Sequence, residues 1–296
     1  MDTVTPGPFT STGRGPRLLG GGAGGRRGPV VSTISTLVVL GALAAVFVLA
    51  PGSRQVRHAF FSPPAMWHSF IGNPKQGYYS VGAAIWLNIR IFCVAEVLIL
   101  ILALVIALVR QSTGPVLFPL RLLCMVYVDL FRGVPLLLVV YAVGLGVPAL
   151  NLPVLSSQSA SVYGATALVL SYSAYVSEVY RAGLNSVHTS QVAAARSLGL
   201  SQPAALRYVI LPQAVRNIIP PLLNDFISLQ KDTALVGVLG AIEANQAAQI
   251  YASSQFNYSS FTVAAILFLI LTIPLARFTD HLIERDRRRR LAGGTA

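Results

Sequence analysis

Apolar runs of about 20 residues recur along this sequence, and such a run is what an α-helix needs to cross a hydrocarbon layer about 30 Å thick. Charged residues make up 11% of the chain, whereas soluble domains carry about a quarter. The mean hydropathy is +0.66. These features predict an all-α, polytopic membrane helical bundle with about six transmembrane helices. The expected spans are 30–50, 84–109, 119–146, 161–183, 221–246 and 260–281.

The ends of the chain and the first connection differ from these spans in composition. Residues 1–29 are rich in Gly, Pro, Ser, Thr and Arg, which predicts a disordered basic tail. Residues 30–50 form the expected N-terminal transmembrane helix. A cleaved signal peptide is the rival interpretation of 1–50, but the apolar run is too long for a typical signal sequence. Residues 51–83 are expected to form an extracytoplasmic connection, and 283–296 a basic cytoplasmic tail.

The net charge of +12 raises the possibility of nucleic-acid binding. The positive residues lie in short segments that flank the apolar spans, so no nucleic acid is expected. Positive residues gather on the cytoplasmic side of membrane proteins. That rule places both termini and the loop 185–220 in the cytoplasm. Cys93 and Cys124 lie in or beside apolar spans, so neither a disulfide framework nor a metal site is expected.

The loop between the fourth and fifth spans is polar and helix-forming. Its first part is rich in Ala, the best helix former, and ends at Gly199, a residue that can adopt the left-handed conformation that terminates helices. Ser201 can cap a second helix, and Pro203 is tolerated in its first turn. The pair Leu211-Pro212 is expected to break that second helix. A compact helix–turn–helix is therefore predicted on the inner face of the membrane.

This loop resembles the EAA loop of ATP-binding-cassette (ABC) importer permeases. The family pattern runs Glu-Ala-Ala, three residues, Gly, nine residues, Ile, one residue, Leu-Pro. Matching positions here are held by Ala194, Ala195, Gly199, Val209, Leu211 and Pro212. Ala193 stands where the family has Glu, which removes a polar side chain and leaves the helix shape unchanged.

Three further segments resemble the polar-amino-acid branch of that family, the histidine, glutamine and glutamate permeases. They are the run Arg132-Gly-Val-Pro-Leu, the run from Ala174 to Gly183, and the run from Asn224 to Thr233. The resemblance covers about two-thirds of the chain. It implies that 84–282 is the transmembrane domain of a type I importer, with a five-helix core preceded by one extra helix.

The resemblance also implies partners and a role for the loop. They are a cytoplasmic ABC ATPase dimer, a second permease subunit (homologous or identical), an extracytoplasmic amino-acid-binding protein and the lipid bilayer of a bacterial cell membrane. The ATPase-coupling loop consists of Gln191, Ala193, Ala194, Ala195, Gly199, Leu211 and Pro212. Neither lysine of the chain lies in a phosphate-binding Gly-x4-Gly-Lys-Ser/Thr loop. We therefore expect no catalytic residue and no cofactor here, with ATP bound by the partner.

Ionisable residues at membrane depth cost at least ~2.5–3.5 kcal/mol on insertion scales and are functional candidates by default. Asp129 and Arg132 stand three apart, as do Glu178 and Arg181, so each pair can meet on one helix face. These pairs either line the substrate path or neutralise each other at helix ends. Glu96 has no charged residue at helical spacing on its cytoplasmic side. The residues expected to form the path or its gate are Asp129, Arg132, Tyr175, Glu178, Asn224, Lys231 and Asp232.

The expected function is import of a polar amino acid by alternating access, driven by a partner ATPase. Glutamate is the first substrate expected, because the Arg-rich composition and the extra N-terminal span resemble actinobacterial glutamate uptake systems. Glutamine or a basic amino acid stays open. A secondary transporter or channel without an ATPase is the alternative function, but the internal repeats typical of that class are not visible. An intramembrane enzyme is disfavoured, since no Ser/His or Asp/Asp arrangement appears within the spans.

Overall fold

The structure is a computed structural model that describes residues 27–293. The tail predicted at 1–29 lies almost wholly outside the described residues. The chain divides into two compact units, residues 1–55 and 56–296, and each is described by itself.

The first unit contains one long helix, α1 (Arg27–Leu49), which agrees with the span expected at 30–50. Its stretch from Val31 to Leu49 is long and apolar enough to cross a membrane. After it the chain turns, and the hydroxyl of Ser53 donates a hydrogen bond of 2.8 Å to the carbonyl of Val48. The next helix, α2 (Ser53–Phe60), begins there and continues into the second unit.

The second unit is built from helices joined by short connections, and the part of it that the structure describes contains no strand. The predicted all-α class is confirmed. In chain order the elements after α2 are α3 (Pro63–Ile71), η1 (Pro74–Gln76), α4 (Val81–Gln111), α5 (Phe118–Gly133), α6 (Leu136–Ala149), α7 (Ala160–Asn185), α8 (Thr189–Ser197), α9 (Gln202–Ala205), η2 (Leu206–Ile210), α10 (Leu211–Asp232), η3 (Thr233–Leu239), α11 (Ala244–Gln255) and α12 (Ser259–Gly293).

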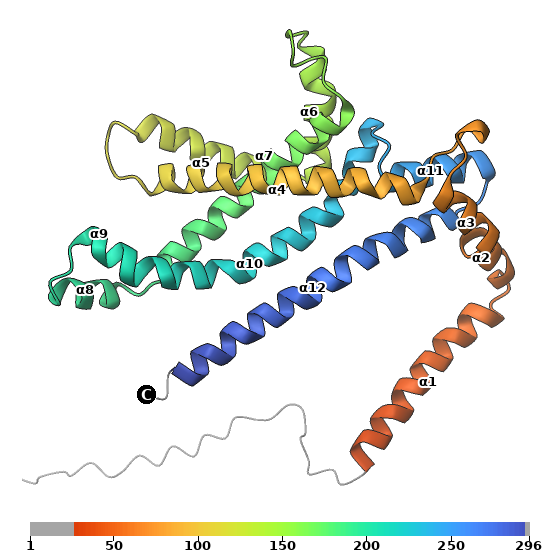
Figure 1. The fold of residues 1–296 in the computed structure, drawn as a ribbon, viewed down its shortest axis with the longest axis horizontal. Helices are drawn as coiled ribbons and strands as arrows, with labels where there is room; N and C mark the ends of the chain where they lie inside the picture. The colour runs from red at the N-terminus through yellow and green to blue at the C-terminus, as the bar shows by residue number, and fades with distance from the viewer. Residues whose placement is uncertain (1–26, 294–296) are drawn as a thin grey trace, which may run out of the picture. The chain divides into compact units, whose positions relative to one another are not determined.

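Helix α7 is the centre of this unit and packs against α4, α5, α6, α10 and η3 (Figure 1). Its contact with α4 follows a four-residue repeat, which places side chains in one ridge on each helix. Every second member of the α4 ridge is alanine, which lets the two backbones approach closely. The buried ridge residues are Ile91, Ala95, Ile99 and Ala103 on α4 and Leu168, Tyr172 and Val176 on α7.

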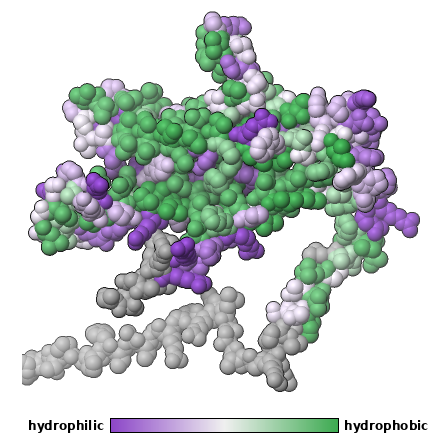
Figure 2. Space-filling model, in the orientation of Figure 1, coloured by the Kyte–Doolittle hydropathy of each residue, from purple (hydrophilic) through white to green (hydrophobic). Residues whose placement is uncertain are grey.

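Three described helices are long and apolar enough to cross a membrane, namely α1, α4 and α12. Figure 2 shows a broad apolar surface on the second unit, with hydrophilic residues gathered mainly toward its ends. The span expected at 119–146 is not one straight helix, because α5 and α6 meet at an angle of 111°. Val134 at this bend is extended, as expected for a residue that precedes a proline.

Among the described residues, neither of the spans expected at 161–183 and 221–246 holds a single helix that is both long and apolar enough to cross a membrane. The first corresponds to α7, whose buried serines lower its hydropathy. The prediction of a single helix at 221–246 was wrong. Helix α10 already begins at Leu211 and ends at Asp232, the 3₁₀ helix η3 follows, and α11 begins at Ala244.

The predicted helix break at Leu211-Pro212 was also wrong. The chain is helical from Gln202 to Asp232, through α9, η2 and α10. The element η2 is a π-helical turn in which the N–H of Leu211 donates to the carbonyl of Leu206, five residues earlier. Proline normally clashes with the carbonyl four residues before it. The wider π turn before Pro212 gives that ring room, so the helix continues.

Two terminal or connecting segments contain more helix than the sequence predicted. Residues 283–293 of the predicted basic tail continue α12, and the predicted connection at 51–83 contains α2, α3 and η1.

A buried polar network joins α4, η3 and α11. The amide Nδ2 of Asn88 donates to Thr233 Oγ1 at 3.1 Å and to Glu243 Oε2 at 3.0 Å, and its Oδ1 accepts from the N–H of Ala244 at 3.0 Å. Glu243 in turn caps the first turn of α11 through two backbone N–H groups. Asn88 and Glu243 are 1% and 0% exposed. Water does not reach these groups, so the bonds within the network satisfy them.

We expect Asn88→Ala to lower the free energy of unfolding by about 1–3 kcal/mol, since it leaves buried polar groups without partners. Thermal unfolding of the detergent-solubilised protein measures this effect. Gln249→Ala is the matched control, because Gln249 is an exposed residue of α11. Equal unfolding temperatures for the two variants would contradict a stabilising role of the network.

Candidate functional site

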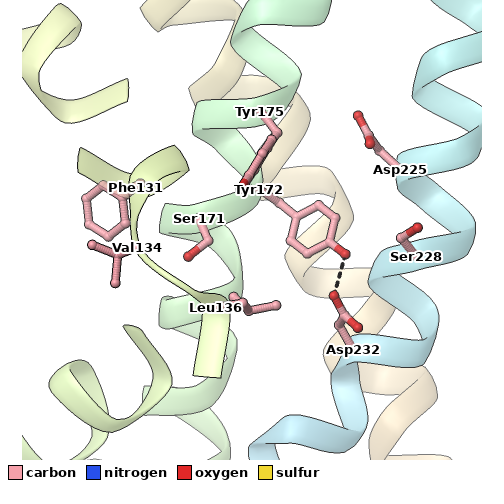
Figure 3. A pocket seen from close by; sticks show the side chains of 9 residues that line it. All are labelled: Phe131, Val134, Leu136, Ser171, Tyr172, Tyr175, Asp225, Ser228 and Asp232. Atoms are coloured by element: carbon pink, nitrogen blue, oxygen red, sulfur yellow. Dashed lines mark hydrogen bonds between the residues drawn. The ribbon is translucent and has the colours of Figure 1, made fainter. Parts of the chain in front are cut away.

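A cavity of about 230 Å³ lies between α7, α10 and the junction of α5 with α6 (Figure 3). Helix α7 contributes Ser171, Tyr172 and Tyr175, and α10 contributes carboxylate and hydroxyl groups. The bend between α5 and α6 closes one side with apolar side chains. The residues from α10 and the bend are Asp225, Ser228, Asp232, Phe131, Val134 and Leu136.

The polar groups of this cavity are only partly paired. Tyr172 donates a hydrogen bond of 2.7 Å to Asp232 Oδ2, which links α7 to α10 (Figure 3). Within the described residues, Asp225 Oδ2 and Ser171 Oγ are buried and have no hydrogen-bond partner. A buried polar atom without a partner is costly and calls for an explanation. A ligand or water that donates to Asp225 would supply the missing bond.

A second cavity of about 570 Å³ shares Asp225 and Tyr175 with the first. Arg132 lines it and places its guanidinium 5.7 Å from the ring centre of Tyr175. The hydroxyl of Tyr175 donates to the carbonyl of Arg132 at 3.2 Å. The other lining residues include Glu178, Asn217 and Pro221. The two cavities therefore form neighbouring compartments with both signs of charge on their walls.

The structure brings four of the seven predicted path residues to these two cavities, namely Arg132, Tyr175, Glu178 and Asp232. Asp129, Asn224 and Lys231 are exposed and line neither of the two. The pair expected between Asp129 and Arg132 was wrong. No salt bridge joins them in the part of the chain that the structure describes, and Arg132 lies over Tyr175 instead.

Sequence reasoning missed Asp225, Ser228, Ser171 and Tyr172 as cavity residues. One signal could have found those on α10. Asp225, Ser228 and Asp232 follow the three- and four-residue spacing that places side chains on one helix face. Carboxylates in such a row at membrane depth indicate a water-filled or substrate-lined surface.

Glu178 is the hub of an ion-pair network between α4 and α7. It forms the expected pair with Arg181 at 2.8 Å and a second one with Arg110, a residue from the last turn of α4. Arg110 is 12% exposed and Arg181 is 40% exposed. Glu178 also lines the second cavity, so the network braces the wall of that cavity.

The loop that follows α7 folds as two helices joined by a tight turn. Helix α8 ends before Gly199, whose φ of +83° is the predicted left-handed conformation. Ser201 caps α9, as predicted, by accepting from the N–H of Ala204 at 3.4 Å. The predicted coupling residues are exposed except Ala195. Leu198, beside the turn, is 84% exposed, an unusual position for a large apolar side chain.

Comparison with known proteins assigns this arrangement to a family. The model of the family described as "Binding-protein-dependent transport system inner membrane component" matches residues 101–288. The probable amino-acid permease protein YxeN of Bacillus subtilis (strain 168) is 38% identical over 192 residues, which cover 64% of this chain and 84% of that protein. The probable glutamine ABC transporter permease protein GlnM of the same organism is 35% identical over 168 residues, covering 56% and 76%. A solved structure of "an amino acid ABC transporter with histidines" has a TM-score of 0.64 and 30% identity, over 69% of this chain and 93% of that one.

We expect Glu178→Ala to destabilise the protein by about 3 kcal/mol, because it leaves the largely buried Arg110 without its partner. Arg181→Ala is the matched comparison. Its exposed pair should be worth less than about 1 kcal/mol. Chemical unfolding of the two variants in detergent measures the difference. Similar losses in both would show that the contact with Arg110 does not brace the two helices.

Proposed function

Because this chain belongs to the family of binding-protein-dependent transport system inner membrane components, we propose that it is the permease subunit of an ABC importer for a polar amino acid. It is a multi-pass membrane protein, and the proposal adds its location in a bacterial cell membrane with both termini in the cytoplasm. The two polar cavities between α7 and α10, within the stretch that the family model matches, carry the proposal.

The chemistry of the cavities suits an amino acid, which carries a positive ammonium and a negative carboxylate. In this proposal the ammonium lies against Asp225, whose buried Oδ2 has no partner among the described residues. The carboxylate lies toward Arg132 and the hydroxyl groups. Charge-assisted hydrogen bonds of these kinds are the strong ones in proteins. Lys231, Asn224 and Asp129 lie outside the two cavities, and their proposed role is at a gate that opens in another conformation.

Glutamate is the proposed substrate, and glutamine, which stands in the names of several relatives, is the rival. A glutamate side chain adds a second negative charge to a cavity that already holds Asp225 and Asp232. The side-chain carboxylate of glutamate therefore has to lie toward Arg132, whereas the neutral amide of glutamine does not. Because the α-carboxylate of both substrates also lies toward Arg132 in this proposal, loss of Arg132 should lower the uptake of both, and that of glutamate more strongly.

Uptake of radiolabelled glutamate, by cells with and without this gene, tests the function. We expect uptake to depend on the gene and to be competed more strongly by excess glutamate than by glutamine or arginine. Competition mainly by glutamine would make glutamine the substrate and leave the proposed class, an ABC importer for a polar amino acid, unchanged. Uptake that persists without ATP or a binding protein would favour the secondary transporter.

The cavity assignment is tested in the same assay. We expect Asp225→Asn to lower uptake at least about tenfold, which corresponds to the 1.4 kcal/mol of one moderate charged contact. Asp280→Asn, an isosteric loss of charge at an exposed site on α12, is the control and should transport normally.

The exposed loop is proposed as the surface that a partner ATPase dimer grips, with α8 as the coupling helix. The positive φ of Gly199, between the end of α8 and the start of α9, sets the direction of one helix relative to the other. Ala193 and Ala194 are exposed on α8, and with the exposed Leu198 they leave a low-relief patch that a groove can enclose. A second permease subunit and an external amino-acid-binding protein complete the proposed importer.

We expect Gly199→Val to uncouple transport from ATP hydrolysis, because a β-branched residue is strained at positive φ. Gly199→Asn is the matched control, since Asn tolerates the left-handed conformation. Both variants are reconstituted into vesicles with the ATPase and the binding protein, and ATPase activity and uptake are measured together. Coupled transport by the valine variant would contradict the role of the turn.

A further inference from the structure

Exposed aromatic side chains gather at one end of the second unit, on α2, on α3 and at the turn between α11 and α12. Trp67 is 61% exposed and Tyr258 is 47% exposed, although both rings could be buried in a core. Phe60 stacks on Tyr258 with 5.3 Å between ring centres, and Trp67 stacks on Phe70 at 6.1 Å. We call this group, with Phe256, the aromatic collar.

The collar is fixed to the start of α12 by hydrogen bonds between segments about 200 residues apart in sequence. The hydroxyl of Thr262 donates to the carbonyl of Phe60 at 2.6 Å, and the N–H of Ser62 donates to Ser259 Oγ at 3.1 Å. Asn257 Nδ2 donates to the carbonyl of His58 at 3.0 Å. The end of α2 and the start of α12 therefore form one rigid corner.

The other side of the collar is fixed to α4. The hydroxyl of Ser80, which caps α4, donates to the carbonyl of Phe70 at 2.6 Å. Gly82 lies so close to the Phe70 ring that an added Cβ would meet its carbon atoms at 2.6 Å. The collar is thus seated at the first turns of both α4 and α12, at the end of the unit away from α8 and α9 (Figure 1).

The collar lies where α4 and α12 begin. Helices α4 and α12 are each long and apolar enough to cross a membrane, so their first turns lie near one face of the hydrocarbon layer. The exposed apolar surface of α4 runs from Val94 through Val97, Ile101, Val105 and Leu108. The exposed Arg90 lies between this surface and Trp86. A charged side chain at this level is typical of the edge of the hydrocarbon layer, and the collar lies on the side of Arg90 toward the start of α4.

We propose that the aromatic collar lies in the headgroup region of the lipid bilayer and sets the depth of α4 and α12. Trp and Tyr are enriched at this level because one end of the ring is apolar and the other is wet. Arg57 and His58 are exposed on α2 beside the collar, where lipid phosphates can pair with them. The part of the collar on α2 and α3 lies outside residues 101–288 that the family model matches, whereas Phe256 and Tyr258 lie inside them. The inference does not depend on the transported substrate.

The two tryptophans of the chain, Trp67 and Trp86, make a direct test possible. The W86F variant retains only Trp67, and W67F retains only Trp86. Each full-length variant is reconstituted alone into vesicles of phosphatidylcholine and phosphatidylglycerol that contain lipids brominated either near the headgroup or near the chain end. Trp86 is the sixth residue of α4, about 7 Å along the helix from its start at 1.5 Å per residue.

We expect the Trp67 fluorescence to be quenched more than twofold more strongly by the shallow bromines than by the deep ones, and Trp86 to show a smaller preference for the shallow ones. Aqueous iodide should quench Trp67 weakly. Strong iodide quenching with no effect of either brominated lipid would overturn the proposal and leave the collar as a surface for a protein. Preferential quenching of Trp67 by the deep bromines would equally overturn the interfacial placement.

Discussion

A polar group at membrane depth must find its partner inside the protein or in a cavity that the protein lines, because hydrocarbon supplies none. The second unit meets this requirement mainly with contacts between helices. Asn88 satisfies α4, η3 and α11 together. Tyr172 joins α7 to α10 through Asp232, and Glu178 joins α7 to α4 through Arg110. Each of these contacts also fixes the distance between elements that are separate in sequence.

The central place of α7 follows from the same constraint. Its serines and glycines lower its hydropathy, so it is a poor helix to expose to lipid and a good one to surround with protein. Gly183 illustrates this, because an added Cβ would meet Ile218 of α10 at 2.1 Å. The glycine seen in the sequence segment from Ala174 to Gly183 is therefore a packing position, at which α10 approaches the end of α7.

Much of the fold was predictable from the sequence, since long apolar runs fix the helices that face lipid. The turn at Gly199 and the cap at Ser201 were predictable because local conformation depends on local residue type. The bend between α5 and α6 and the passage of the helix through Pro212 were not predicted. Proline allows either a bend or a compensating wide turn, and the choice depends on packing.

The candidate site was predictable only in part. Arg132, Tyr175, Glu178 and Asp232 were found because charged or aromatic residues near membrane spans are conspicuous. Their actual partners come from distant segments, as Tyr175 does for Arg132, and a single sequence carries no signal for such pairings. Spacing within one helix is legible from the sequence, whereas the neighbour that a helix face meets is a property of the packed bundle.

The π turn at η2 rotates the helix that follows it. A π turn is equivalent to one residue inserted into an α-helix, and one residue corresponds to a rotation of about 100° at 3.6 residues per turn. The side chains of α10, which begins at Leu211, therefore point in directions that an uninterrupted α-helix would not give them. This rotation, measured from the loop at Gly199, is the one with which Asp225 and Asp232 point into their cavity. A single wide turn thus sets the angle between the surface of the loop and the carboxylates of the cavity.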